Sequence, residues 1–249
     1  YMVGTEDDNA RARVSRKVIG EREKWTFEQW TRAATDTRVL LADEYIPKLA
    51  AAFDSLKTKD AARAAKLEPH VRLLLEWNRV STVESIGMTL FSRMMNAAGP
   101  TGPLLDGLER SVAQLEANFK SARVPWGDFN RHQRTHWSGN EPFSDTVRSV
   151  GVPGAPGWLG IVYVFNTTSQ RGAIRRYGTH GNSYVSVVEF APRVRAQSIV
   201  YFGQSGNPAS PNYFDQAEIY ARGSFKPAWF HRDEVTANAV RTYHPGQGN

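Results

Sequence analysis

The chain contains no cysteine among its 249 residues. This excludes disulfide bonds, thiolate nucleophiles and cysteine-ligated metals, but it leaves the cellular compartment open, because cysteine-free proteins suit oxidising and reducing spaces alike. Long apolar runs are also missing, and runs such as Ile161 to Phe165 are far too short to span a bilayer. The first residues lead directly into Glu6, Asp7 and Asp8. Because a secretory signal begins with basic residues, none is predicted at this start.

A strong excess of charge of one sign is missing as well. The net charge is +6, yet residues 1–125 carry 19 basic and 17 acidic side chains, and residues 126–249 carry 12 and 8. The densest basic patch is Arg171 with Arg175 and Arg176. A phosphate groove needs a longer basic stripe. A solvated surface is therefore the favoured interpretation of this patch, and no nucleic-acid partner is expected.

The composition that remains is that of a globular chain, with 41% hydrophobic and 22% charged residues. Its first half has helical patterns. Thr26 to Gln29 fits a capping box, and Trp25 and Trp30 stand where they would staple the helix entry. Ser81 to Glu84 repeats the cap signature before an apolar stripe at helical spacing. Further helices are expected at Val39 to Phe53, Val71 to Trp77 and Leu104 to Phe119.

The second half changes character. Glycine and proline cluster from Gly151 to Gly157, which is a loop signal. A short helix is expected from Asp215 to Arg222, ending at Gly223. Runs of Val, Ile, Tyr and Phe predict strands at Trp158 to Phe165, Tyr184 to Phe190 and Ser198 to Phe202. Helices first and strands later indicate an α+β fold rather than alternating βαβ units. Three strands are few for an independent sheet, so partner strands are expected elsewhere.

Two motifs invite a catalytic or metal-binding interpretation and do not support it. His132 and His136 have the spacing of two ligands on one helix face, but no third ligand stands at a telling distance, so a surface or packing role is favoured. Gly203-Gln204-Ser205-Gly206 has its second glycine one position too early for a nucleophile elbow. A tight turn is the favoured interpretation there.

Three further patterns are weak on residue chemistry alone. Glu6-Asp7-Asp8 lacks the spaced loop of a calcium module and reads as an acidic turn before a helix. Asn166-Thr167-Thr168 matches a glycosylation acceptor, a pattern that is frequent by chance. The basic run contains Arg11, Arg13, Arg16 and Lys17. An exposed helix with local ion pairs is its simplest interpretation, and none of these residues by itself identifies a reaction.

The order of several segments is more informative than any one of them. The segments are Asn9-Ala10-Arg11-Ala12-Arg13, Trp25 to Trp30, Leu75-Glu76-Trp77-Asn78-Arg79 with Glu84-Ser85, Val124 to Arg131, Gly181 to Phe190, Gly203-Gln204-Ser205-Gly206, Asn212 to Gln216, and Tyr243-His244-Pro245-Gly246. Taken together they resemble the penicillin amidase family, in particular its acyl-homoserine-lactone and aculeacin acylase branch. The resemblance extends over nearly the whole chain and points to the C-terminal part of the family's β subunit.

The resemblance implies a fold. Members of this family of N-terminal-nucleophile hydrolases have an αββα sandwich, two stacked antiparallel sheets between helical layers. Residues 1–125 would form a helical layer of the β chain, and residues 126–249 the strand-rich C-terminal portion of the same acylase domain. The missing partner strands would then come from the α chain and from the N-terminal part of the β chain.

The resemblance also implies a mechanism. In the family a precursor, or zymogen, cleaves itself and frees a nucleophile, usually serine, at the N-terminus of the β chain, where its own α-amine acts as the base. Tyr1 has no aliphatic hydroxyl, so the nucleophile and the oxyanion-hole Asn are expected upstream, and this chain alone is expected to be inactive. The family's active-site arginine falls on Arg11, with Arg13 as second choice.

Further expectations follow from the same resemblance. The substrate would be an N-acylated small molecule with a linear amide, such as an N-acyl-homoserine lactone of quorum sensing, a β-lactam antibiotic or an acylated lipopeptide. No cofactor is expected, and the ligands of the structural calcium found in the family would lie outside this chain. The location would be the periplasm or the cell exterior. The alternative is a non-catalytic binding or structural domain with an acylase-like fold.

Overall fold

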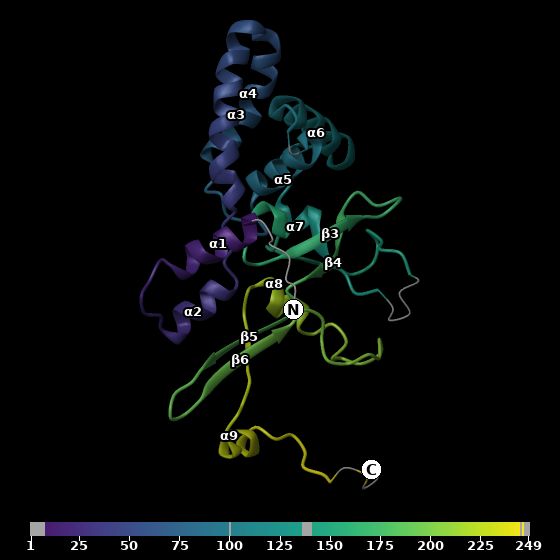
Figure 1. Ribbon diagram of the computed structural model, residues 1–249. Helices are drawn as coiled ribbons and strands as arrows, with labels where there is room; N and C mark the ends of the chain where they lie inside the picture. The colour runs from purple at the N-terminus through teal and green to yellow at the C-terminus, as the bar shows by residue number, and fades with distance from the viewer. Residues whose placement is uncertain (1–7, 100, 136–140, 245, 247–249) are drawn as a thin grey trace, which may run out of the picture.

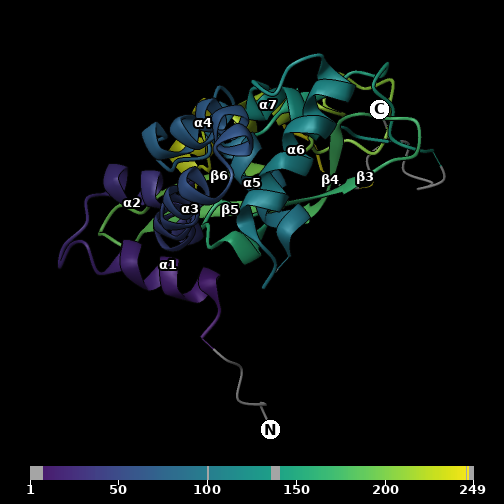
Figure 2. The same ribbon diagram turned by 90° about the horizontal axis from the view of Figure 1, so that it is seen from above.

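The computed structural model describes residues 8–99, 101–135, 141–244 and 246. Helices occupy most of the first half and the described strands all lie in the second, which confirms the α+β expectation (Figure 1). The long helices α3 and α4 stand side by side as a pair that projects away from the strands, with α5 and α6 beside them (Figure 1). Seen from above, α3 to α6 gather over the strands and α1 lies to one side (Figure 2).

The helical half begins with two short helices and continues with two antiparallel pairs. The helices of this half are α1 (Ala10–Ile19), α2 (Phe27–Ala34), α3 (Leu40–Lys59), α4 (Ala61–Glu76), α5 (Ile86–Ala98), α6 (Leu104–Phe119) and α7 (Trp126–Phe129). The predicted capping box is confirmed, because the Thr26 hydroxyl accepts from the Gln29 N–H and the Gln29 side chain accepts from the Thr26 N–H. Trp25 and Trp30 pack edge to face with their ring centroids 5.3 Å apart.

Three expectations about helix ends were wrong, and one concerns α4, which begins at Ala61 rather than at Val71. Helix α5 does not begin after Ser81: its N-cap is Ser85, whose hydroxyl accepts from the Met88 N–H. Ser81 is instead buried and donates its hydroxyl to the Pro153 carbonyl. Local capping chemistry permits both serines, and the distant loop around Pro153 selects between them. Helix α3 also continues through Pro47 to Lys59.

The strands form two sheets. Strands β1 (Asn130–His132), β2 (Val150–Gly151), β3 (Phe165–Ser169) and β4 (Arg176–Gly181) are ordered β2-β1-β4-β3. Strands β5 (Tyr184–Glu189), β6 (Arg195–Val200) and β7 (Lys226–Pro227) are ordered β5-β6-β7. All pairs are antiparallel except β1 with β4, which is parallel. The predicted strands at Tyr184 and Ser198 correspond to β5 and β6, and the predicted helix ending at Gly223 is α8 (Ala217–Ala221). A last short helix, α9 (Arg232–Ala237), follows β7.

The strand predicted from Trp158 to Phe165 was wrong. Gly157–Leu159 forms the 3₁₀ helix η1, and β3 begins only at Phe165. Gly160 follows η1 with a φ of 72°, a left-handed conformation that favours glycine. A β-carbon there would stand 2.8 Å from Cβ of Leu40. The close approach of α3 therefore bends the chain where its apolar residues alone favour a strand.

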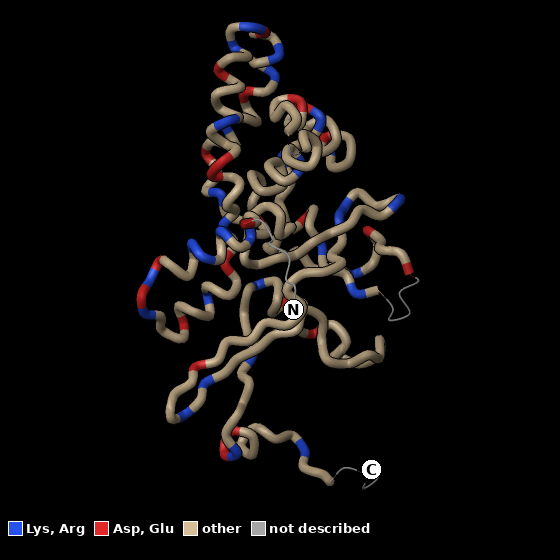
Figure 3. Tube along the Cα trace, in the orientation of Figure 1, with Lys and Arg blue, Asp and Glu red and all other residues tan. Residues whose placement is uncertain are grey.

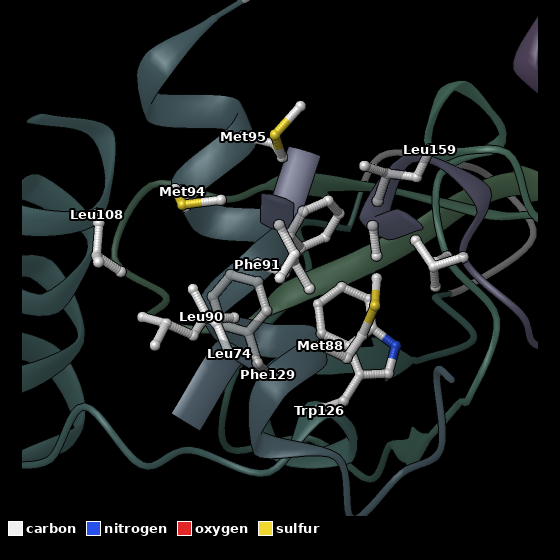
Figure 4. Close-up of a cluster of buried hydrophobic side chains, with 14 of the residues drawn as sticks. Leu74, Met88, Leu90, Phe91, Met94, Met95, Leu108, Trp126, Phe129 and Leu159 are labelled. Carbon is white, nitrogen blue, oxygen red and sulfur yellow. The ribbon is translucent and has the colours of Figure 1, made fainter. Parts of the chain in front are cut away.

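One hydrophobic core joins both halves. Phe91, Met88 and Met94 of α5 face Leu74, Leu108 and the rings of Trp126 and Phe129 in the buried cluster shown in Figure 4. Trp126 and Phe129 lie with their ring centroids 5.8 Å apart. The core continues into the strand half through Leu159, Ile161 and Phe165. Helices and strands therefore share their buried surface.

A small polar junction fixes where the halves meet. The buried Asn130 side chain donates its amide to the carbonyls of Val152, at 2.7 Å, and Gly154, at 2.9 Å. The indole N–H of Trp126 donates to the same Gly154 carbonyl at 3.1 Å. Backbone carbonyls that are buried away from water need such donors. The junction, defined here as Trp126, Asn130, Val152 and Gly154, therefore holds the glycine- and proline-rich loop against the core.

Replacing Asn130 by Asp tests the junction. The substitution keeps the shape but exchanges the amide donor for an acceptor, which leaves the two carbonyls facing a carboxylate. We expect the free energy of unfolding to fall by about 3 kcal/mol, measured by urea denaturation of the 249-residue chain. Asn212→Asp is the matched control, because Asn212 is exposed. Equal stability of the two variants would contradict the role given to Asn130.

Candidate functional site

Arg11 lies in the first turn of α1, the helix that begins after the N-cap Asn9. The Asn9 side chain accepts from the Ala12 N–H at 2.9 Å and so starts the helix at this point. The Arg11 guanidinium extends to the turn between β4 and β5, where its Nη2 donates to Oδ1 of Asn182 at 3.4 Å. Arg11 thereby connects the first helix with the place where the chain passes from one sheet to the other.

Arg11 differs from the rest of the basic run. Arg13 is paired with Glu44 at 2.8 Å, Arg16 with Asp8, and Lys17 with Asp43 at 3.3 Å. Within the described ranges Arg11 forms no ion pair. The local ion pairing expected of an exposed helix is therefore present for three of the four residues, and the Arg11 guanidinium, which donates to Asn182, has no described carboxylate partner.

The cationic partners lower the pKa values of two of these carboxylates. The hydrogen bond from Arg16 lowers the pKa of Asp8. Partial burial acts to raise the pKa of Asp43, but hydrogen bonds from Arg79 and Lys17 outweigh it and leave that pKa lowered. Both acids are therefore held ionised near neutral pH. Basic and acidic side chains are interspersed along the rest of the chain as well (Figure 3).

A cavity of about 250 Å³ lies between the two sheets, and Asn182 forms part of its wall. The remaining lining residues come from the ends of β3, β4 and β6, from the β4–β5 turn and from α8, and are Phe165, Thr179, His180, Gly181, Ser183, Tyr201 and Tyr220. We call it the inter-sheet cavity. Its aromatic walls and its contact with Arg11 through Asn182 give it apolar surface beside a cationic group, which suits an apolar chain that carries a polar end.

Two further hydrogen bonds, one from its side chain and one from its backbone, hold Asn182 in place. Its amide nitrogen donates to the Val162 carbonyl at 3.2 Å, and its backbone N–H donates to the Val164 carbonyl at 2.9 Å. The segment between η1 and β3 therefore orients the side-chain oxygen of Asn182 toward Arg11. Sequence reasoning named Arg11 but missed Asn182. Its position between two strand-forming runs, directly after Gly181, was the available signal.

Tyr220 contributes a second feature of the cavity wall. It is 2% exposed, and its hydroxyl has no hydrogen-bond partner among the described residues. Its backbone carbonyl accepts from the Tyr163 hydroxyl at 2.5 Å. Burial raises the pKa of both hydroxyls, so both stay protonated; Tyr163 donates its proton to a carbonyl, and the Tyr220 hydroxyl has no described acceptor. Sequence reasoning placed Tyr220 in a helix and gave it no role.

His132 is a core residue of β1 rather than a ligand on a helix. It is fully buried, and its ring stacks on Tyr201 and Phe202 with centroids 4.9 Å and 4.8 Å away. Nε2 lies 2.5 Å from the Tyr201 carbonyl. Since a carbonyl can only accept, Nε2 carries the proton. The packing role expected for this residue holds, and its predicted companion His136 lies outside the described residues.

No metal cluster accompanies His132. In the described ranges, no group of three His, Asp or Glu side chains stands close enough to hold a metal ion. Glu6 and Asp7 of the acidic turn lie outside the described residues, whereas Asp8 is engaged by Arg16. No described helix is long and apolar enough to cross a membrane.

The segment Gly203-Gln204-Ser205-Gly206 lies in an irregular loop with bends at Gln204 and Gly206, and the hydrogen-bonded turn comes just after it, where the Ser210 N–H donates to the Asn207 carbonyl at 3.0 Å. The Ser205 hydroxyl accepts from the Asn207 N–H at 3.1 Å, and its carbonyl accepts from Arg134 at 2.9 Å. Arg134 also lies over the Tyr213 ring, 3.9 Å from its centroid. Arg134 therefore clamps this loop, and no histidine or carboxylate contacts the serine hydroxyl among the described side chains.

Comparisons with known proteins agree on one family. The sequence profile described as penicillin amidase matches residues 1–237. An acyl-homoserine lactone acylase PvdQ of Pseudomonas fluorescens (strain Pf0-1) is 24% identical over 223 residues, which cover 82% of this chain and 28% of that protein. The PvdQ acylase of Pseudomonas savastanoi pv. phaseolicola is 24% identical over 250 residues, 92% of this chain and 32% of that protein.

A solved structure supports the fold. A thermostable penicillin G acylase from Alcaligenes faecalis matches 98% of this chain and 53% of its own, with a TM-score of 0.52 and 13% identity. At this identity the likeness concerns the fold alone. The chain spans about a third or less of the length of the curated relatives named above, 28% and 32%.

Because His132 is buried, we predict that the folded chain becomes less stable at acid pH. Burial lowers the pKa of His132 from its ordinary 6.5 to about 4. Between pH 6.5 and 4 the unfolded chain therefore binds a proton that the folded chain does not. The free energy of unfolding is therefore unaffected by this histidine above pH 6.5. As the pH falls from 6.5 to 4, it decreases by about 3 kcal/mol in total.

Urea denaturation between pH 7 and pH 4 measures this loss for the 249-residue chain. His132→Gln retains a nitrogen donor for the Tyr201 carbonyl but does not titrate, so its stability should depend less on pH over this range. His180→Gln is the matched control, because His180 is exposed, and it should keep the slope of the unmodified chain. A His132→Gln variant with an unchanged slope would disprove the assignment.

Proposed function

Because the chain belongs to the penicillin amidase family, we propose that it is the C-terminal part of an acylase that hydrolyses the linear amide of an N-acylated small molecule. The observation that carries the proposal is the match of the family profile to residues 1–237. The position of Arg11 supports it, because the residue placed by the family resemblance is the member of the basic run that keeps its guanidinium free of described carboxylates.

The surface of the chain supports the existence of a larger assembly. Its accessible surface is 14810 Å², whereas a compact protein of 27.9 kDa exposes about 11,000 Å². Large apolar side chains contribute to the excess, among them Tyr184 at 61%, Phe190 at 91% and Phe230 at 68% exposure. Exposed apolar surface of this kind marks an interaction site. In the proposal it is covered by the remainder of the acylase, its α chain and the N-terminal part of its β chain.

The proposed chemistry divides between two parts of the acylase. An N-terminal serine on another segment attacks the amide carbonyl, and its own α-amine takes the hydroxyl proton and passes it to the amine that leaves as the amide bond breaks. Water then hydrolyses the acyl-enzyme ester and releases the acid. Arg11 holds the nucleophile region in place from this chain, and Asn182 orients the Arg11 guanidinium. The inter-sheet cavity offers apolar surface next to that region. No cofactor enters these steps.

The substrate class we favour is the N-acyl-homoserine lactones. The PvdQ relatives are named as acyl-homoserine lactone acylases, and their matches cover 82% and 92% of this chain. The amide in such substrates joins an apolar acyl chain to a polar head, which fits an aromatic cavity beside a guanidinium. A location in the periplasm or outside the cell follows from the same proposal.

The proposal predicts that the 249-residue chain alone does not turn over acyl amides. The purified chain is incubated with an N-acyl-homoserine lactone and with a β-lactam that carries an acyl side chain, and free amine is measured. No release above the blank is expected. Release of free amine at the rate of the complete acylase would disprove the proposal that the nucleophile lies on another segment. Inactivity of the complete protein would instead favour a binding or structural role.

Arg11 is tested in the complete acylase. We expect Arg11→Ala to lower kcat by about 10²- to 10³-fold, the effect of losing one charged group that orients the reacting centre. Arg16→Ala removes a neighbouring guanidinium that is 62% exposed and should change kcat less than twofold. Arg13→Ala should act on stability through Glu44. Thermal unfolding of all three variants separates folding from catalysis, and an unchanged kcat in Arg11→Ala would refute its role.

A further inference from the structure

Arg79 has a backbone conformation that is rare for its residue type. Its φ is 62°, in the left-handed region that a β-carbon disfavours and glycine adopts freely. Among the described residues Lys120 is the other non-glycine with a positive φ, and it caps the end of α6, where left-handed residues are common. Arg79 instead lies in the loop between α4 and α5. Strain of this kind at a residue with a side chain indicates that the side chain is needed there.

Both the backbone and the side chain of Arg79 hold the start of α3. Its carbonyl accepts from the N–H of Val39, the N-cap of α3, at 3.0 Å. Its guanidinium donates through Nη1 to Oδ1 of Asp43, in the first turn of α3, at 2.8 Å. Glycine would adopt this φ without strain and keep the first contact, but it would lose the second. What arginine adds at this position is therefore its bond to Asp43.

Asp43 also binds α1. Its other oxygen, Oδ2, accepts from Nζ of Lys17, in the last turn of α1, at 3.3 Å. One carboxylate therefore connects three segments, α1, α3 and the loop that contains Arg79, whereas the neighbouring Arg13–Glu44 pair connects α1 with α3. Helix α1 lies beside the start of α3 (Figure 1). The bridge formed by Arg79, Asp43 and Lys17 therefore fixes where the end of α1 lies.

Packing alone leaves α1 room to move at this point. A cavity of about 110 Å³ lies between α1, the start of α3 and the loop, and its lining includes Val14, Lys17, Asp43 and Arg79. Protein interiors are usually close-packed, so a hollow beside a helix permits small shifts of that helix. Because Lys17, Asp43 and Arg79 come from three different walls of this cavity, their ion pairs connect those walls.

The position of α1 decides where Arg11 points. Arg11, Val14 and Val18 are spaced three and four residues apart and therefore lie on one face of the helix. This face meets η1, because a β-carbon at Gly157 would lie 3.8 Å from Cδ of Arg11. The hydrogen bond from Arg11 to Asn182 is long, at 3.4 Å. A small rotation of α1 would therefore break it.

We infer that Arg79 is a positioning residue for Arg11, which it keeps directed toward Asn182 by fixing α1 through Asp43 and Lys17. Its role is to orient another side chain and not to contact the substrate. The value of this orientation for catalysis rests on the proposed function, whereas the orientation itself does not. The inference also gives a role to the segment Leu75 to Arg79, one of those on which the family resemblance depends.

NMR of the 249-residue chain tests the orientation. The Nε–H resonance of Arg11 is assigned by its loss in Arg11→Ala. We expect it to shift in Arg79→Gly, which relieves the backbone and removes the guanidinium, and to return in Arg79→Lys, whose ammonium also reaches Asp43. Lys17→Ala breaks the same bridge at an exposed side chain and should shift it as well. Lys120→Gly is the matched control, because it relieves the same φ of 62° away from α1, and it should leave the resonance unchanged.

The complete acylase tests the consequence for catalysis. Arg79→Gly should lower kcat about tenfold and change KM less than twofold, because a misplaced orienting group acts on the transition state. Arg79→Lys should restore most of kcat, and Lys120→Gly should not change it. In the Arg11→Ala background, Arg79→Gly should have almost no further effect, since residues that act as a unit are not additive.

Three results would overturn the inference: an Arg11 resonance that does not move in Arg79→Gly, one that moves equally in Lys120→Gly, or a tenfold fall in kcat that persists in the Arg11→Ala background. The NMR experiment needs no turnover. A resonance that moves as expected, in a protein without acylase activity, would support the positioning of Arg11 and contradict the proposed function instead.

Discussion

The polar junction between Asn130 and the loop carbonyls of Val152 and Gly154 is the contact on which the arrangement of this chain depends. It lies where the last helix of the helical half becomes the first strand. Trp126 strengthens it from the helical side by donating to Gly154. Because buried carbonyls need donors, these bonds hold the loop against the start of β1, the strand that also pairs with β4.

The functional region proposed around Arg11 follows from this placement. Once β4 is fixed, the β4–β5 turn carries Asn182 to Arg11, whose helix is anchored by Asn9. This region leaves a guanidinium beside an aromatic cavity. Arg11 has no described carboxylate partner, whereas Arg13 and Arg16 have one, which is expected of a surface that binds something else.

The exposed apolar side chains complete this picture. Strand β5 is an edge strand, and Tyr184 and Val188 on one of its faces are 61% and 38% exposed. Edge strands with apolar faces invite pairing with other chains. The opposite face is covered, because Gln197 and Arg195 of β6 reach Thr31 and Glu28 of α2. One face of this sheet is therefore covered by α2 and the other is exposed, as expected of a surface that another polypeptide can cover.

The sequence by itself determined the features that depend on neighbouring residues. The capping box at Thr26, the amphipathic helix at Leu104 and the hairpin strands at Tyr184 and Ser198 all follow from local spacing and propensity. Order and spacing of short segments also identified the family and led to the prediction, still to be tested, that Arg11 is its active-site arginine. Tertiary structure alone decided that Ser85 rather than Ser81 caps α5, that the apolar run after Trp158 bends instead of extending, and that Arg11 rather than Arg13 stays unpaired. Those outcomes depend on Pro153, Leu40 and Glu44, residues 30 or more positions away, whose approach no local pattern encodes.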